Sequence, residues 1–293
     1  MLTLALLVLA LQGVADLSPA ESRTLTVSVT DDKGGPVTGL RTDEVVVLEN
    51  GVARDVSRLE PETRPLMVAV IVDSSQPIGS LYRLNLVDEV ARFVGRLPDG
   101  SRYALWTTGD RPTKVVDFTD DASRAGRALK RTFPRGGNTV LDAVIEASED
   151  LKEKEGERTA VVVVSGNGLG FSSYDRTEVV DRALRTGHTF MTVNFQEGAA
   201  PGDPGFAGSR DAVGSVGRAD YDHVLGSLAD RSGGLRETPL SAMGVGRSLE
   251  KIAAALGGQY RITYSTLPDL KERKVEVRVA RPGVKVSLRG SRS

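Results

Sequence analysis

The chain has 293 residues, with 38 Lys and Arg against 39 Asp and Glu, two His, no Cys and 40% hydrophobic residues. This length indicates about two domains, and the apolar fraction is sufficient for packed cores. A net charge of -1 argues against nucleic-acid binding, which depends on excess positive charge. The absence of Cys excludes disulfides and thiolate sites, and two His are too few for a three-His zinc site. The composition therefore favours a protein that is not an enzyme.

The first residues are apolar from Leu2 to Leu11. This run is too short for a transmembrane helix, which needs about 20 apolar residues. It fits the hydrophobic region of a signal peptide with Gly13–Ala15 as a small-residue cleavage site, although no positive charge precedes the run. The alternative is a buried strand or helix of the mature domain. We expect residues 1–20 to be a signal peptide, the mature chain to lack a membrane span, and the protein to be exported to the periplasm, the cell surface or the medium.

The next part of the chain predicts a small antiparallel β unit. Residues 25–30 alternate apolar and polar side chains, and residues 44–49 form a second predicted strand. Asn50-Gly51 is a strong hairpin signal, because both central residues of a type I′ turn need a positive φ. We expect residues 52–59 to be the return strand and residues 60–65, with two prolines, to be a linker.

Strands then alternate with helices. Residues 66–72 and 160–164 are continuous apolar runs, which are typical of strands buried on both faces. The alternation implies a parallel sheet covered by helices on both sides. Residues 197–220 are rich in Gly, Ala, Pro and Asp, and we expect a loop there. The other predicted strands are 103–107, 114–118 and 189–194, and the predicted helices are 86–97, 121–131, 140–154, 177–185, 221–230 and 242–256.

The last residues return to antiparallel β structure, with predicted strands at 259–265, 275–279 and 284–288. Neither terminal β segment has enough strands to be stable alone. We therefore expect the two segments to pack together as one sandwich-like module, with a doubly wound, mostly parallel α/β domain inserted between them. The predicted organisation is a signal peptide at 1–20, a β module from 21–62 and 258–290, and the α/β domain at 65–257.

Polar residues follow the buried strands of the predicted sheet. Three loops leave strand ends at Asp73–Pro77, Gly136–Thr139 and Ser165–Gly168. In an open parallel sheet, ligands bind at the carboxyl ends of the strands. A carboxylate and hydroxyls in this position are ligands that Mg²⁺ prefers. The loops therefore indicate a candidate site for a divalent cation.

These loops resemble the motifs of a von Willebrand factor A (vWA) domain, and in particular those of a vWA-related family known from acidobacteria. The resemblance implies a vWA fold and a protein-binding function. It covers roughly residues 24–290. The segments that carry it are 66–79 (strand and D-x-S-x-S motif), 136–143 (G-G-T-x-L-x-D-A motif), 161–168 (strand and third motif), Glu49–Gly51 (hairpin) and Gln259–Tyr264 (final strand).

In that family these loops form a metal-ion-dependent adhesion site. An Asp and two hydroxyls of the first motif, a Thr of the second and an Asp of the third hold the ion. Carried over by position, the resemblance keeps Asp73 and Ser75, whereas the second hydroxyl falls on Pro77. The Thr falls on Asn138, or on Thr139 if the loop is one residue shorter.

The third-motif Asp falls on Gly166, and Asn167 stands next to it. One of the family's two carboxylates is therefore missing, and we expect no firmly held cofactor and at most weak binding of Mg²⁺ or another divalent cation. The alternative is that Asp73 and Ser75 cap a helix beginning near Ser80 or stabilise their loop. The candidate metal ligands are Asp73, Ser75, Asn138, Thr139 and Asn167.

A serine nucleophile at Ser75 or Ser165 would need a His base within hydrogen-bond reach. We expect structural or surface roles for His188, which begins a predicted strand, and for His223, in a predicted helix. We therefore expect an exported, non-enzymatic, adhesion-type module whose partner is another protein. The alternative is a structural or scaffolding component of an envelope assembly with a vestigial loop site.

Overall fold

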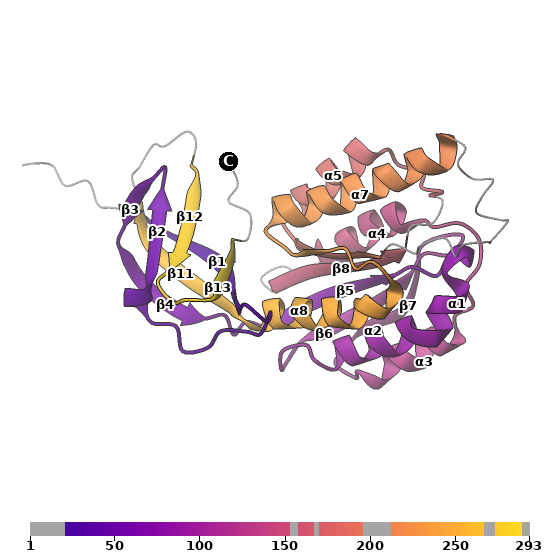
Figure 1. Cartoon of the computed structure of the whole chain (residues 1–293), viewed down its shortest axis with the longest axis horizontal. Helices are drawn as coiled ribbons and strands as arrows, with labels where there is room; N and C mark the ends of the chain where they lie inside the picture. Colours follow the sequence, from indigo (N-terminus) through magenta and orange to yellow (C-terminus); the bar gives the residue numbers. More distant parts are fainter. Residues whose placement is uncertain (1–20, 153–157, 167–169, 196–211, 267–272, 289–293) are drawn as a thin grey trace, which may run out of the picture.

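The computed structural model of this chain describes residues 21–152, 158–166, 170–195, 212–266 and 273–288. The predicted signal peptide lies outside these residues. An α/β domain and an antiparallel β module lie at opposite ends of an elongated molecule (Figure 1). Within the described ranges, no helix is both long and apolar enough to cross a membrane.

The central sheet of the α/β domain is mostly parallel. Its strands are β5 (Leu66–Val72), β6 (Arg102–Thr107), β7 (Thr113–Thr119), β8 (Arg158–Gly166), β9 (Thr189–Phe195) and β10 (Arg236–Glu237). They lie in the order β10-β9-β8-β5-β6-β7, and only β7 runs antiparallel to its neighbour. The predicted doubly wound, mostly parallel architecture is therefore confirmed.

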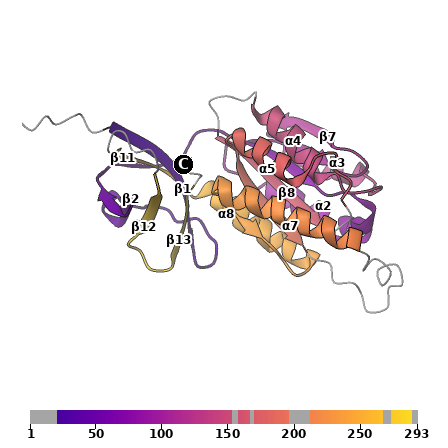
Figure 2. The same ribbon diagram turned by 90° about the horizontal axis from the view of Figure 1, so that it is seen from above.

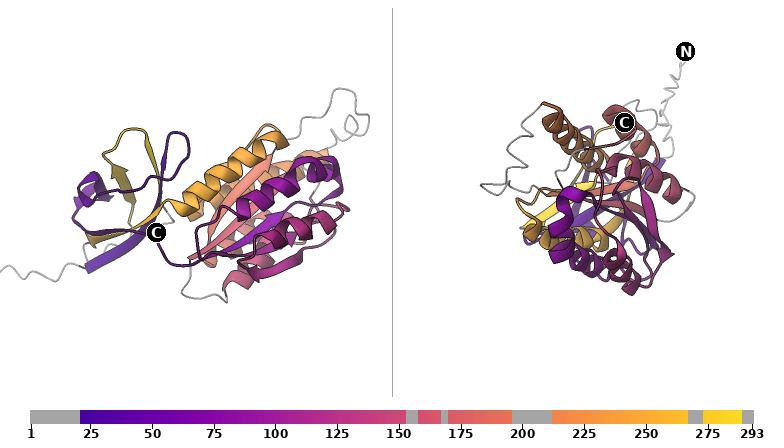
Figure 3. Two further views of the ribbon diagram at one scale, coloured as in Figure 1. Left: turned by 90° about the horizontal axis from the view of Figure 1, so that it is seen from below. Right: turned by 90° about the vertical axis from the view of Figure 1, so that its right-hand side faces the viewer.

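Helices cover both faces of this sheet. One face carries α2 (Val87–Val94), α3 (Ser123–Arg131) and α8 (Val245–Gly257), and the other carries α4 (Val140–Lys152), α5 (Arg176–Arg185) and α7 (Ala212–Ser232) (Figure 2 and Figure 3). Val68 and Val70 of β5 belong to the core beneath the first face, while Ala69 and Ile71 belong to the core beneath the second. Successive side chains of a strand point to opposite faces, so a strand covered on both sides must be apolar throughout.

The β module is built from both ends of the described chain. Its first sheet has the order β13-β1-β11-β4, and its second sheet has the order β12-β2-β3. Val29, Val47 and Ile262 lie in the core between them and are fully buried. The strands are β1 (Glu21–Asp31), β2 (Val45–Glu49), β3 (Val52–Arg54), β4 (Val56–Pro61), β11 (Gln259–Thr266), β12 (Val275–Val279) and β13 (Val284–Leu288), and a short helical turn, η1 (Thr42–Glu44), precedes β2.

The predicted hairpin turn is confirmed, but its return strand is not continuous. Asn50 and Gly51 have φ values of 51° and 81°, as a type I′ turn requires. The chain then breaks at Asp55, so that β3 pairs with β2 while β4 pairs with β11 of the other sheet. A strand that turns a sandwich corner changes sheets in this way.

The helix predicted over residues 86–97 corresponds to α2, and further helical turns precede it from Gly79, including a π-helical turn at 82–86 that breaks the 3.6-residue spacing. The helix predicted at 221–230 was wrong at its start. Residues 212–220 were expected to form a loop, yet α7 begins at Ala212. Each Gly there costs only about 1 kcal/mol, and extending a helix from a packed half is easier than nucleating one. The short elements are η2 (Gln76–Ile78), α1 (Gly79–Leu81), η3 (Tyr82–Leu86) and η4 (Ala242–Gly244).

Arg158 joins the two parts of the molecule. Its side chain is buried at the start of β8 and donates to the carbonyl oxygens of Glu62 (3.3 Å) and Leu256 (2.6 Å) and to the Gln259 side chain (2.8 Å). Glu62 and Gln259 lie on the two connections between the β module and the α/β domain. One guanidinium therefore holds both connections in place.

The β module also contains a buried carboxylate, Glu49. It accepts hydrogen bonds from Thr266 (2.8 and 2.9 Å) and Arg273 (3.2 Å), and Arg54 lies 3.2 Å away. Burial disfavours the charge, but the hydrogen bonds and the two guanidinium groups outweigh it and hold the pKa of Glu49 below its ordinary value.

Glu49 predicts that acid weakens the β module. Because its folded pKa is lowered, Glu49 contributes stability above its unfolded pKa, near 4.5, and this contribution is lost as the pH falls through the folded pKa. We expect Glu49→Gln to lower the free energy of unfolding by about 2 kcal/mol at pH 7 and to flatten its dependence on pH below 5. Urea unfolding measured from pH 7 to pH 3 checks this, with Glu21→Gln, an exposed position of β1 in the same module, as control. An equal pH profile for wild type and Glu49→Gln would refute it.

Candidate functional site

The candidate site lies at the end of the α/β domain opposite the β module. We call this end the top face, and it consists of residues 73–84, 108–112, 132–139, 170–175 and 238–244. The parallel strands of the central sheet all end there, so that loops far apart in sequence converge (Figure 3, right). Asp73, Ser75, Asn138 and Thr139 of the predicted ligand set lie among these loops, and Asn167 lies outside the described residues.

Asp73 is fully buried directly after β5. One carboxylate oxygen accepts a hydrogen bond from the backbone N–H of Ser75 (2.9 Å). The other accepts from the Gly166 N–H (3.0 Å) and from the Asn138 amide (2.8 Å). Burial raises the pKa of Asp73 above its ordinary value, although the hydrogen bonds from Ser75 and Gly166 act in the opposite direction. Both oxygens therefore already have donors from the protein.

Asn138 is the centre of this network. Its Oδ1 accepts hydrogen bonds from the Thr108 hydroxyl and from the Val140 N–H, both at 3.0 Å. Its Nδ2 donates to Asp73 and, at 3.0 Å, to Ser165 Oγ. The backbone donor on Val140 settles which side-chain atom is oxygen. A hydrogen-bond donor, rather than an oxygen ligand, therefore points at Asp73.

The other predicted hydroxyl ligands have different surroundings. Thr139 Oγ1 donates to the Thr108 carbonyl oxygen at 2.8 Å, so this hydroxyl stabilises the loop after β6. Ser75 Oγ is buried and has no hydrogen-bond partner among the described residues.

Gly166 occupies the position of the third-motif carboxylate, and side chains fill the space around it. A Cβ atom on Gly166 would lie 2.7 Å from Ile78 Cγ2 and 3.0 Å from Phe195 Cε2. Both neighbours are buried. An Asp at this position would require the core beneath the loop to rearrange, because the Ile78 and Phe195 side chains occupy the space that its carboxylate would need.

The described residues do not fit a Mg²⁺ ion. Mg²⁺ needs several oxygen ligands in an octahedron, whereas here the Asp73 oxygens are hydrogen-bonded, Asn138 presents a donor, and Pro77 and Gly166 offer no side-chain oxygen. The described ranges also hold no cluster of three or more His, Cys, Asp or Glu arranged to bind a metal.

The structure distinguishes the two alternative roles of Asp73 and Ser75, which are helix capping and loop stabilisation. Neither caps a helix through its side chain: Ser75 precedes η2 without a side-chain capping bond. Asp73 instead stabilises its own loop through the Ser75 N–H. The capping interpretation was therefore wrong, and the loop-stabilising one is confirmed for Asp73.

Three contributors to this network were missed in the sequence. Ser74 Oγ accepts hydrogen bonds from the Thr108 N–H (3.2 Å) and the Gly109 N–H (2.9 Å). Tyr221 donates to the Asn138 carbonyl oxygen (2.8 Å), and burial raises the pKa of this phenol to about 12. Ser74 and Thr108 follow strand ends, a signal that could have identified them. Tyr221 has no such signal, because only the packing of α7 brings it there.

The two histidines have the structural and surface positions expected. His188 is buried and bonds Thr159 (2.8 Å) and the Ser148 carbonyl oxygen (2.9 Å). Thr159 is at the start of β8 and Ser165 is at its other end, so His188 lies at the opposite end of this strand from Ser165. His223 is exposed on α7.

The hydrogen bonds of Asp73 give a test with a definite sign. In an empty metal site, neutralising a carboxylate relieves repulsion and stabilises the protein. Here Asp73→Asn sets an amide N–H₂ against donors from Asn138 and Gly166, and we expect a loss of about 3 kcal/mol in unfolding free energy. Urea denaturation at pH 7 measures it. Asp110→Asn on the same face, where Asp110 is half exposed beside Arg135, is the matched control and should change little. An Asp73→Asn variant as stable as wild type would contradict this network.

Comparisons with known proteins bear on the fold. A family model described as von Willebrand factor type A domain matches residues 68–169. No curated protein gives a significant match. Proximal thread matrix protein 1 from the mussel byssus has 14% identity and a TM-score of 0.50, covering 76% of this chain and 50% of its own. This chain thus spans half the length of the mussel protein.

Two further structures are similar at lower scores. The vWF domain of the pilus tip protein Mfa5 from Porphyromonas gingivalis has 13% identity and a TM-score of 0.49, covering 66% of this chain and 95% of its own. The protein BatB from Bacteroides thetaiotaomicron has 13% identity and a TM-score of 0.46, covering 64% and 98%. At such identities the likeness concerns the fold. The family model and the sheet order thus show a von Willebrand factor type A fold in the α/β domain, with the family match at residues 68–169.

Proposed function

We propose that this chain is an exported, non-enzymatic protein-binding module of adhesion type, and that its top face binds a protein partner without a metal ion. In this proposal residues 1–20 are the signal peptide, residues 21–62 and 258–290 form the β module, and residues 65–257 form the vWA domain. The similar folds include a pilus tip domain and a byssus thread protein, which supports a role in protein contacts.

The observation that carries the proposal is a group of exposed apolar side chains on the top face. Leu84 lies in η3, and Met243 lies in η4, which contacts η3. Phe133 follows α3, and the Arg83 guanidinium lies 5.7 Å from its ring centroid. Large apolar side chains gathered at one end of a domain are typical of a protein-binding surface. The group is Leu84, Phe133, Phe171, Leu240 and Met243, each between 63% and 85% exposed.

The bonding of Asp73 supports a contact that does not depend on a metal ion. A cation entering this site would have to replace the Asn138 amide and would find no second carboxylate at Gly166. We therefore expect a partner to be held by contact with the exposed apolar group, and no acidic side chain of the partner is needed to complete a metal shell.

Calorimetric titration of the full chain with Mg²⁺, Mn²⁺ and Ca²⁺ tests the metal-free state. We expect no saturable heat up to about 10 mM ion, and an unchanged melting temperature, since a bound ion would raise it. Heat with a dissociation constant below 1 mM that Asp73→Ala abolishes would show that the site is rebuilt, with Asn167 as the remaining candidate ligand.

Partner capture tests the surface. Immobilised wild type and the triple variant Leu84→Ser/Phe133→Ser/Met243→Ser are compared on envelope extract of the producing organism. We expect the triple variant to retain its fold and to lose at least 90% of the specifically captured protein. The matched control is Val46→Ser/Val52→Ser, which changes exposed apolar residues of the β module. The reverse result, with capture lost only in this control, would favour the scaffolding alternative, in which the β module makes the contacts.

A further inference from the structure

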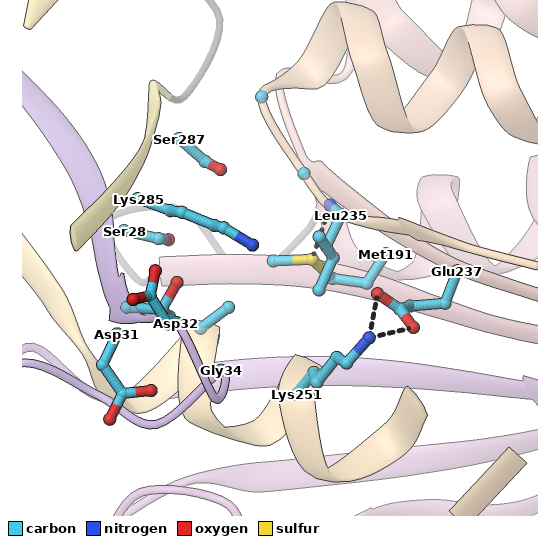
Figure 4. A pocket seen from close by; sticks show the side chains of 14 residues that line it. Ser28, Asp31, Asp32, Gly34, Met191, Leu235, Glu237, Lys251, Lys285 and Ser287 are labelled. Atoms are coloured by element: carbon cyan, nitrogen blue, oxygen red, sulfur yellow. Dashed lines mark hydrogen bonds and ion pairs between the residues drawn. The ribbon is translucent and has the colours of Figure 1, made fainter. Parts of the chain in front are cut away.

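A cavity of about 150 Å³ lies between the β module and the α/β domain (Figure 4). Strands β1 and β13 line one side of it, and β9, the segment before β10, and α8 line the other. It is at the far end of the α/β domain from the top face, so its chemistry is separate from that of the candidate site.

The wall from the β module is polar. Ser28 pairs with Ser287 and Thr30 with Lys285 in the register of β1 and β13, so these four side chains share one face. The intervening Val27 and Val29 point into the core of the module. Alternation of this kind ordinarily leaves the polar face in water, but here that face lies over the cavity and presents hydroxyl and ammonium donors.

The opposite wall combines an apolar part with an ion pair. Met191 of β9, Leu235, and Ala255 of α8 form the apolar part, and Glu237 and Lys251 form the ion pair. The Leu235 N–H lies 3.1 Å from the Met191 sulfur. The cavity therefore offers hydrogen-bond donors on one side and apolar surface on the other. Pockets that bind small organic molecules commonly combine these two kinds of lining.

Among the described residues that line this pocket, Lys285 is the cation without a carboxylate partner, and it is exposed to solvent. Its side chain extends into the cavity towards Met191 and Leu235 (Figure 4). Lys251, by contrast, pairs with Glu237 at 2.8 Å. Asp31 accepts hydrogen bonds from the backbone of its own turn, at the N–H groups of Lys33 and Gly35, and Asp32 packs against the turn at Gly283.

We propose that this pocket binds a small amphiphilic carboxylate. The carboxylate lies against the Lys285 ammonium and the hydroxyls of Ser28 and Ser287, and the apolar body lies on Met191 and Leu235. A cavity of about 150 Å³ admits a body the size of benzene, which makes benzoate a suitable probe. A ligand held in this position contacts both the β module and the α/β domain and so stabilises their relative arrangement.

The proposal is tested by titrating the full chain with benzoate at constant ionic strength, followed by NMR shifts or calorimetry. For a ligand of this size we expect a dissociation constant of about 1 mM or lower. Lys285→Met, which keeps the aliphatic stem and removes the charge, should weaken binding at least tenfold. Benzyl alcohol, with the same ring and no charge, should bind at least tenfold more weakly than benzoate.

Two matched variants keep the test decisive. Lys274→Met removes an exposed lysine outside the pocket and should leave benzoate binding unchanged. Ala255→Leu fills the cavity while keeping Lys285, and it should abolish binding. Absence of binding at 20 mM benzoate, or equal affinity for wild type and Lys285→Met, would overturn the proposal.

Discussion

The hydrogen bond from the Asn138 amide to the Asp73 carboxylate is the interaction on which the top face depends. A buried carboxylate needs compensation for the hydration it loses, and either a cation or several hydrogen-bond donors can supply it. In this chain Asn138 supplies one donor and backbone N–H groups supply the others. The same amide bonds Thr108, Ser165 and Val140. One side chain thus joins the ends of three strands and the start of α4.

This hydrogen bonding matters for the proposed binding of a partner because it holds the loops of the top face in place from beneath the surface. Tyr221 and the Phe171 N–H both bond the Asn138 carbonyl oxygen, so α7 and the loop after β8 are fixed to the same residue. The exposed apolar side chains are consequently carried by loops that hydrogen bonds join beneath them. A surface that is already ordered loses less conformational entropy on binding, which favours contact through shape.

The sequence predicted the architecture well, because the signals for it are local. Continuous apolar runs identified the doubly covered strands, and Asn50-Gly51 identified the hairpin. The site was less predictable. Gly166 indicated a missing carboxylate, but sequence alone did not reveal that Ile78 and Phe195 fill its place. Asn138 was predicted to be a ligand because the motif Thr of the resembled family falls on it, whereas the direction of its amide depends on Thr108 and Val140, which only the fold brings to it.

Each end of the α/β domain contains a buried charged group that has lost its hydration, a carboxylate at one end and a guanidinium at the other. At the top a buried carboxylate is stabilised by donors, and at the junction the buried Arg158 guanidinium is stabilised by the carbonyl oxygens of Glu62 and Leu256. Removing water from a guanidinium is costly, so the buried Arg158 side chain is favoured only in the geometry in which these hydrogen bonds form. Gln259 accepts a hydrogen bond from Arg158 and donates one to Ser28, which lines the cavity beside Lys285, so a ligand in the proposed pocket would act on the same junction.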